Sequence, residues 1–167
     1  YGLRLDATHA ILDASSRHLL AEIADVAHER GAFVIAEDER NLSAVIALDG
    51  HGMDAVYADD FCHSIQVALG DSSYQEDFTG SAAELADELW HGWHYRGQLS
   101  KHLGAPRGSS SDHLPPEKFA CCISNHDQVG NRAFGERLHQ ITTPEAYRAA
   151  SALLLLGEPL DAATALE

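Results

Sequence analysis

The sequence predicts an α/β fold, specifically an incomplete (β/α)8 barrel in which parallel strands alternate with helices. Three apolar segments that are typical of buried strands are each followed by acids, among them Asp6, Glu37 and Asp127. Strands that present acids at their carboxyl ends are how such a barrel builds an active site at one rim. A complete barrel takes about 250 residues. We therefore expect the 167 residues to form a single, incomplete domain from the interior of a longer protein.

The first part of the chain alternates strand-like and helical segments. Apolar runs predict strands over residues 2–6, 32–37 and 54–58. Between the first two strands, Ser15 or Ser16 is suited to cap a helix that continues to about residue 30. Gly31 follows it, in the position where helices often end on a left-handed residue. The helix has apolar residues at helical spacing, namely Leu19, Leu20, Ile23, Ala24, Val26 and Ala27.

The second part predicts further helices and one more strand. Ser81 is suited to cap a helix that continues to about residue 95, with Glu84 in the acidic position of a capping box. Residues 97–116 are rich in Gly, Pro and Ser and predict a long loop. The remaining expected elements are a helix over 61–69, a polar loop over 70–80, a strand over 119–124 and helices over 132–138 and 144–156. This order favours a parallel sheet with helical crossovers.

The acidic composition restricts the partners. Asp and Glu total 26 against 11 Lys and Arg, which gives a formal net charge of −15. Nucleic acids and anionic membranes favour basic surfaces, so we expect neither as a partner. A neutral substrate such as a sugar is not repelled by this charge. The charges are spread along the chain, which also fits ordinary solubility, and the oligomeric state is left open.

The cysteines indicate a reducing compartment. Cys62, Cys121 and Cys122 have no C-x-x-C spacing, and neighbours in a strand point to opposite faces, which makes Cys121 and Cys122 poor disulfide partners. Free buried thiols are typical of the cytoplasm. The sequence contains no recognisable signal peptide, and the run Leu153–Leu156 is far too short to span a bilayer. We therefore expect a cytoplasmic protein.

Arg4 and Asp6 lie two residues apart on the first strand, so their side chains share one face. A guanidinium beside the carboxylate keeps the carboxylate ionised, as a nucleophile requires. A purely structural ion pair is the alternative. On the second strand, Glu37 follows apolar residues that would raise its pKa, as a general acid requires. Asp38 and Glu39 would raise that pKa further if they face the same rim. A solvated strand end is the alternative there.

The strand predicted over residues 119–124 is followed by Asn125, His126 and Asp127. An acid here can bind sugar hydroxyls and counter positive charge at an anomeric carbon, and an imidazole can donate to a hydroxyl. A hydrogen-bonded polar turn is the alternative for this segment alone. Three acids from three strands match the needs of sugar-bond hydrolysis, which uses a nucleophile, an acid/base and a further charge partner.

Other chemistries have little support. His91 and His94 have a spacing compatible with zinc, but no H-E-x-x-H motif or cysteine pair accompanies them, so we expect a structural or surface role and no metal. The chain has no G-x-G-x-x-G, P-loop or G-x-S-x-G motif. Nucleotide chemistry and serine-hydrolase chemistry are therefore not indicated.

The strand-end segments resemble the conserved regions of the α-amylase superfamily, the family 13 glycoside hydrolases. The similar segments are residues 2–9 (GLRLDATH), 35–37 (IAE) and 125–127 (NHD). The resemblance implies about strands 4 to 7 of a (β/α)8 barrel with their helices. It also implies Asp6 as nucleophile with Arg4 as partner, Glu37 as proton donor and Asp127 as transition-state stabiliser. His126 and His9 would contact the sugar.

A finer resemblance covers residues 1 to about 156 and is to the trehalohydrolase subfamily. It rests on residues 5–11 (LDATHAI), 35–41 (IAEDERN), 54–61 (DAVYADDF), 97–100 (GQLS) and 125–132 (NHDQVGNR). It implies retaining cleavage of the α-1,4 bond next to the terminal trehalose of maltooligosyltrehalose, an α-1,4-glucan oligosaccharide, without a cofactor. Further implied substrate contacts are Thr8, Arg40, Asp59, Asp60, Phe61, His63, Asn125, Gln128 and Asn131.

The chain departs from that subfamily at three places. Cys62 precedes His63 where two histidines are typical, the sequence after Leu156 does not continue into the eighth-strand region, and the superfamily's first conserved region is absent. Two rival functions stay open: an α-glucan branching enzyme or amylase, and an inactive barrel fragment with unpaired sheet edges. We expect the isolated chain to be weak or inactive.

Overall fold

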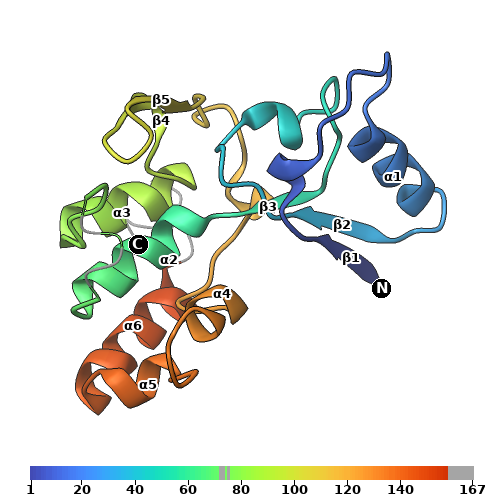
Figure 1. The fold of residues 1–167 in the computed structure, drawn as a ribbon. Helices are drawn as coiled ribbons and strands as arrows, with labels where there is room; N and C mark the ends of the chain where they lie inside the picture. The colour runs from blue at the N-terminus through green and yellow to red at the C-terminus, as the bar shows by residue number, and fades with distance from the viewer. Residues whose placement is uncertain (72–73, 75, 158–167) are drawn as a thin grey trace, which may run out of the picture. The chain divides into compact units, whose positions relative to one another are not determined.

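The structure is a computed structural model that describes residues 1–71, 74 and 76–157 (Figure 1). The part of the divergent tail that follows Gly157 lies outside the described residues. The chain divides into two compact units. The strand unit comprises Tyr1–Ala58 and Tyr95–Ala120, and the helical unit comprises Asp59–His94 and the described residues from Cys121 onward. The assignment of residues 1–167 to a single domain stays a prediction.

Four parallel strands form the sheet of the strand unit. They are β1 (Gly2–Leu5), β2 (Phe33–Ala36), β3 (Ala55–Tyr57) and β6 (Phe119–Ala120), in the order β1-β2-β3-β6. Leu5 is in register with Ala36, and Ala36 with Val56, so the residues that follow β1 and β2 leave the sheet at one edge. The predicted parallel α/β arrangement is confirmed. The last strand ends at Ala120, four residues before its predicted end at 124.

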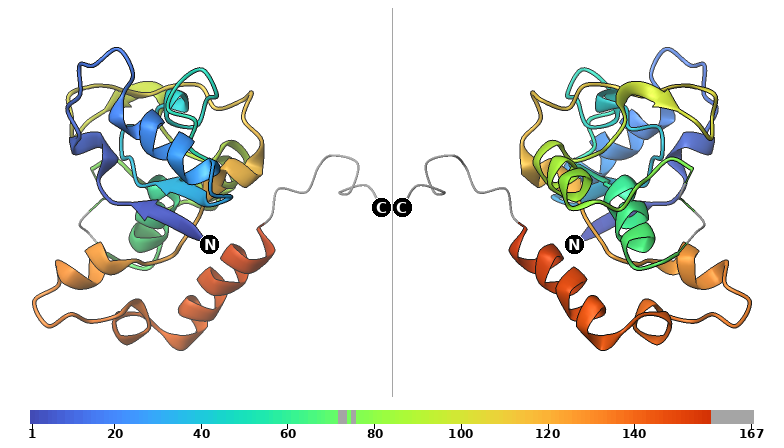
Figure 2. Two further views of the ribbon diagram at one scale, coloured as in Figure 1. Left: turned by 90° about the vertical axis from the view of Figure 1, so that its right-hand side faces the viewer. Right: turned by 90° about the vertical axis from the view of Figure 1, so that its left-hand side faces the viewer.

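Helix α1 (Leu19–His28) packs against β2 (Figures 1 and 2). Leu20, Ala24 and Ala27 form its buried face, and Gly31 adopts a left-handed φ of 65°, as predicted. The expected cap at Ser15 or Ser16 is wrong. The carboxylate of Asp13 accepts the backbone N–H groups of Ser15 and Leu19, which folds this segment into a turn, and the cap is His18.

An antiparallel hairpin forms the first part of the long loop expected over 97–116, and residues 109–115 are irregular as predicted. Its strands are β4 (Arg96–Ser100) and β5 (Ala105–Gly108). Gly108 has φ 83°, and a Cβ there would lie 1.8 Å from the carbonyl oxygen of Tyr95. The hydroxyl of Ser109 donates to the carbonyl of Asn41, which ties the hairpin to the segment after β2. Gly and Pro within these strands masked their pattern, since both are depleted in regular strands.

The helical unit contains α2 (Asp59–Ala68), α3 (Ala82–His91), α4 (His126–Gly130), α5 (Leu138–Ile141) and α6 (Pro144–Leu156). Its core joins Phe61 and Ile65 of α2 to Leu85 of α3 and Ala150 of α6. Ser81 caps α3 as predicted, with its side chain accepting from the N–H of Glu84. Within the described residues, short 3-10 turns are formed by Thr8–Ala10, Ser43–Val45 and Pro116–Lys118. Within the described part of the chain, no helix combines the length and apolarity that crossing a membrane would need.

The helix expected over residues 132–138 is wrong. This stretch forms turns between α4 and α5. The guanidinium of Arg132 reaches along the chain to donate to the carbonyl of Glu136 at 2.9 Å, and it also donates to Gln66 Oε1 at 2.8 Å. These bonds hold the segment in a non-helical path that local periodicity could not indicate.

Candidate active site

The carboxyl ends of β1 and β2 bring Arg4, Asp6 and Glu37 together. Arg4 Nη1 pairs with Asp6 Oδ1, and Arg4 Nη2 lies 2.6 Å from Glu37 Oε1. One guanidinium therefore holds two carboxylates that are thirty-one residues apart in the chain. Burial alone would lower the pKa of Arg4, but the hydrogen bond to Asp6 and the charge of Glu37 outweigh it and raise that pKa. Arg4 stays cationic, so it can favour the ionised form of Asp6.

Glu37 is held on both oxygens by polar groups. Besides the ion pair with Arg4, its Oε2 accepts the backbone N–H of Ala7 at 3.1 Å. Ala7 presents this N–H from a left-handed conformation, with φ 45°. The predicted surroundings of apolar side chains are therefore replaced by a guanidinium and an amide. Glu37 is 6% exposed, which makes it a fixed group in a nearly dry position.

The two carboxylates are close enough for concerted chemistry on one bond. An oxygen of Asp6 lies within 4.8 Å of an oxygen of Glu37. Retaining glycosidases place their two carboxyl groups about 5–5.5 Å apart, whereas inverting enzymes leave about 6.5–9.5 Å for a water. The side chain of Asp6 is 65% exposed and that of Glu37 is 9% exposed. This geometry gives one open carboxylate and one enclosed carboxyl group.

Asp38 supports the site from below the surface. It is 1% exposed, it accepts from Thr8 Oγ1 at 2.9 Å, and it pairs with Arg40, whose Nε lies 2.8 Å from Oδ1. Burial alone would raise the pKa of Asp38, but the hydrogen bonds from Arg40 and Thr8 outweigh it and keep the pKa below its ordinary value. Asp38 is thus directed to Thr8 and Arg40 and is not a second acid beside Glu37.

Asp38→Asn is expected to lower the free energy of unfolding by about 2 kcal/mol, because charged hydrogen bonds to Arg40 are lost. The pKa of Asp38 is lower in the folded state than its ordinary value of about 3.9. Its stabilising effect is therefore present above about pH 4 and lost as the pH falls through the folded value. Urea denaturation of the chain across this range should show the difference from Asp38→Asn shrinking in acid. Exposed Asp49 provides the control Asp49→Asn, expected to change stability by less than about 0.5 kcal/mol.

Three predicted substrate-binding residues of the strand unit have different surroundings. Thr8 is buried, and its hydroxyl is used by Asp38 and by the carbonyl of Glu37. Arg40 forms the ion pair with Asp38 and is partly exposed. His9 Nε2 lies 3.5 Å from Glu39 Oε1. Their substrate contacts stay predictions, and Thr8 and Arg40 have a clear positioning role.

Asp127 and His126 lie on α4 of the helical unit, where Asn125 forms the cap. Asn125 Oδ1 accepts the N–H of Asp127, and Gln128 Oε1 accepts the N–H of Asn125, each at 2.8 Å. This capping box explains why Asn and Gln stand three residues apart. The side chains of His126 and Asp127 are 60% and 54% exposed, so both are available to a ligand. Asn125 and His126 also line a cleft beside α5 and α6.

Of the five remaining predicted contacts of the helical unit, two are buried. Phe61 is fully buried in its core, and buried Asp60 accepts the N–H of His94 at 2.9 Å. His63 stacks on Tyr74 with ring centroids 4.0 Å apart. Asp59 begins α2, and Asn131 ends α4 by donating its N–H to the carbonyl of Asp127. Buried Phe61 and Asp60 fit structural positions, and substrate contact at all five stays a prediction.

Sequence reasoning missed two groups of the site. Arg4 lies over the ring of Tyr57 on β3, with Cζ 5.2 Å from the ring centroid. Arg107 of the hairpin donates to the carbonyl of Glu39 at 2.8 Å. The aromatic residue inside the third strand was visible in the sequence, but its partner depended on strand order. The contact from Arg107 required the hairpin itself.

Comparison with known proteins shows that the chain is similar to malto-oligosyltrehalose trehalohydrolases. The chain is 42% identical over 167 residues to a malto-oligosyltrehalose trehalohydrolase of Deinococcus radiodurans, with 95% of the chain and 28% of the relative covered. The protein of the same name from Saccharolobus solfataricus is 40% identical, with 93% of the chain and 28% of the relative covered. The one from Mycobacterium tuberculosis strain H37Rv is 36% identical, with 96% and 30% covered. No family model matches the chain.

A solved structure is similar to the chain in fold. The crystal structure of a "Putative alpha Amylase" from Salmonella typhimurium superposes with a TM-score of 0.80 at 37% identity, covering 93% of the chain and 28% of that protein. The resemblance predicted from the sequence is confirmed, and so is the partial barrel. The chain spans about 28% of the length of these relatives.

Proposed function

We propose that the chain contributes the nucleophile and the acid/base of a retaining α-glycoside hydrolase. The observation that carries this proposal is the Arg4 guanidinium, which pairs with Asp6 and with Glu37 at the ends of neighbouring parallel strands. A single cation between two carboxylates keeps both groups fixed at the short separation that retention uses. The names of the relatives support glycoside hydrolysis as the reaction.

In the first step, a carboxylate oxygen of Asp6 forms a bond to the anomeric carbon while the glycosidic C–O bond breaks. Glu37 donates its proton to the leaving oxygen. In the second step, Glu37 takes a proton from water, the water oxygen bonds to the anomeric carbon, and Asp6 leaves as a carboxylate. Two inversions retain the configuration. Asp127 would counter the positive charge at the anomeric carbon, and His126 would donate to a hydroxyl of the same sugar.

The proposed substrate is maltooligosyltrehalose, cleaved at the α-1,4 bond next to its terminal trehalose. The relatives' common name supports this choice. The reaction needs acid/base and nucleophilic groups that the chain's own carboxylates supply, so the proposal includes no cofactor. The net charge of −15 is compatible with a neutral oligosaccharide, and nucleic acid and membrane partners are not proposed.

A segment swap tests the proposal. The matched segment of the Deinococcus radiodurans relative is replaced by this chain, and the product is named the swap protein. We expect the swap protein to release trehalose from maltooligosyltrehalose, measured by chromatography, because the chain brings its own Asp6, Glu37 and Asp127. A swap protein that melts cooperatively yet releases no trehalose, while the unmodified relative does, would contradict the proposed function.

An α-glucan branching enzyme or amylase is the second candidate, because the Salmonella structure is described as an alpha amylase. The same acids would serve with a different substrate. Plain maltooligosaccharide supplied in place of maltooligosyltrehalose separates the two. Faster turnover of plain maltooligosaccharide by the swap protein, or formation of branches, would favour this candidate.

We also propose a cytoplasmic location. Cys62, Cys121 and Cys122, which all lie in the described part of the chain, form no disulfide. A hydrogen bond with Cys122 and burial both raise the pKa of the Cys62 thiol, and burial raises that of Cys121 to about 11. Thiols that stay protonated react slowly and persist in a reducing compartment.

A further inference from the structure

The helical unit contains a second cluster of ionisable groups, formed by Glu84, Glu88 and His94. The two glutamates lie four residues apart on α3, so they occupy one face of the helix, and His94 follows the end of α3. One ligand atom from each of the three lies within 4.8 Å of the other two. Two carboxylates and an imidazole are a ligand set suited to Zn²⁺ and related divalent ions.

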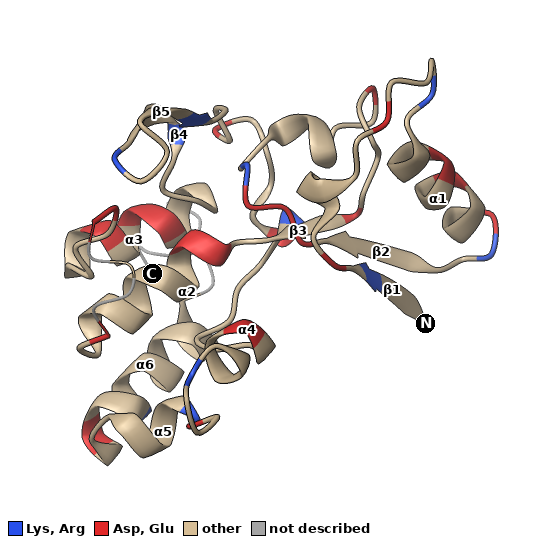
Figure 3. Cartoon of the chain, in the orientation of Figure 1, with Lys and Arg blue, Asp and Glu red and all other residues tan. Residues whose placement is uncertain are grey.

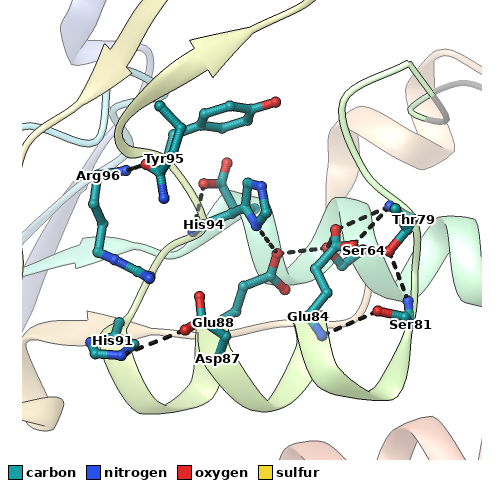
Figure 4. Close-up of polar contacts among 12 residues, drawn as sticks. Ser64, Thr79, Ser81, Glu84, Asp87, Glu88, His91, His94, Tyr95 and Arg96 are labelled. Carbon is teal, nitrogen blue, oxygen red and sulfur yellow. Dashed lines mark hydrogen bonds and ion pairs between the residues drawn. The ribbon is translucent and has the colours of Figure 1, made fainter.

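Glu88 is the central group of this cluster. It is 0% exposed, and its Oε1 accepts from Ser64 Oγ at 2.7 Å and lies 3.8 Å from His94 Nδ1. Figure 4 shows its carboxyl group between the imidazole and the serine hydroxyl. Its other oxygen, Oε2, is buried and accepts no hydrogen bond within the described part of the chain. A buried carboxylate oxygen without a partner is costly, and a bound cation would satisfy it.

The neighbouring groups hold the proposed ligands in place. Ser64 Oγ also lies 2.9 Å from Glu84 Oε1, and Glu84 accepts the N–H of Thr79 as well. Asp60, itself buried, accepts the backbone N–H of His94 at 2.9 Å and so fixes the segment that carries the imidazole. Acidic residues are concentrated at the start of α2 and on α3 (Figure 3), which makes this region attractive to a cation.

We propose that Glu84, Glu88 and His94 bind one divalent transition-metal ion of the Zn²⁺ type. Such an ion would link α3 to the segment after it, while Ser64 on α2 orients both carboxylates, as groups around metal ligands commonly do. His91 is not part of the site, because its Nε2 lies 3.5 Å from Asp87 Oδ1 on the same helix. This site is independent of the proposed glycosidase function.

The test uses the metal-free chain titrated with Zn²⁺, and with Co²⁺ as a coloured probe of coordination by nitrogen and oxygen. We expect one Zn²⁺ per chain by elemental analysis, visible Co²⁺ absorption bands and a higher melting temperature with Zn²⁺. Glu88→Gln should weaken Zn²⁺ binding at least about 10-fold and abolish the rise in melting temperature. Asp87→Asn removes a carboxylate from the same helix and should leave binding unchanged.

His94→Gln provides a second variant if Glu88→Gln fails to fold, and it should also weaken binding at least about 10-fold. The proposal is overturned if the wild-type chain binds no Zn²⁺, or if Zn²⁺ binding is unchanged in a folded Glu88→Gln or His94→Gln variant. Binding that disappears only when the thiols are alkylated would assign the ion to the cysteines instead and would equally overturn it.

Discussion

Asp6→Ala in the swap protein is expected to lower trehalose release by at least about 10⁴-fold, or about 5 kcal/mol in the activation free energy. Asp6 is the open carboxylate of the pair, with a side chain 65% exposed, and Arg4 favours its charged form. Without it, no protein oxygen remains at that position to form the glycosyl-enzyme. The measurement is kcat/KM for maltooligosyltrehalose.

Azide distinguishes loss of the nucleophile from general damage. In Asp6→Ala, azide can enter the space of the lost carboxylate and attack the anomeric carbon directly. One displacement inverts the configuration, so we expect partial recovery of rate and a β-configured glycosyl azide from the α-linked substrate. Asp49→Ala removes an exposed acid and should keep full activity. Activity of Asp6→Ala within 10-fold of the parent, or an α-configured azide product, would remove Asp6 from the role of nucleophile.

The strands and the parallel order were predictable because their signals are local. Apolar runs marked β1, β2 and β3, and a strand–helix–strand order favours parallel neighbours in one sheet, because parallel strands need a long crossover connection. The hairpin β4–β5 was missed because Gly97, Pro106 and Gly108 normally argue against strands. The helix predicted over 132–138 was wrong for a non-local reason: Arg132 donates to Gln66, a residue distant in sequence.

The sequence named the acids of the candidate site, but it could not show the contacts that hold them. Arg4 and Asp6 share a strand face, so their pairing could be expected from spacing alone. The contact from Arg4 to Glu37 depends on the register that sets Leu5 beside Ala36. Likewise, Asp38 follows Glu37 directly in sequence, and only the structure shows it directed toward Thr8 and Arg40. The tertiary register therefore decided that Glu37 pairs with Arg4, whereas its neighbour Asp38 pairs with Arg40.

Loss of Glu37, the enclosed carboxyl group, is expected to have the second large effect on activity. Glu37→Ala in the swap protein is expected to lower kcat/KM for maltooligosyltrehalose by about 10³-fold, since general acid–base catalysis contributes about 10²–10⁴-fold. Glu37 is 6% exposed, so bulk water replaces it poorly as a proton donor. Its removal also frees one side of Arg4, and the melting temperature of the variant should be recorded to separate lost chemistry from lost stability.

A substrate with a better leaving group then tests whether Glu37 acts as the proton donor. An α-glycosyl fluoride needs little protonation to leave, so Glu37→Ala should form its glycosyl-enzyme nearly as fast as the parent and then stall at hydrolysis. Azide should release that intermediate as an α-configured glycosyl azide, because Asp6 has already inverted the centre once. The opposite configurations expected from Asp6→Ala and Glu37→Ala follow from which side of the sugar each carboxylate occupies. If both variants gave the same azide anomer, or if Glu37→Ala were as slow on the fluoride as on maltooligosyltrehalose, the division of roles between these residues would be wrong.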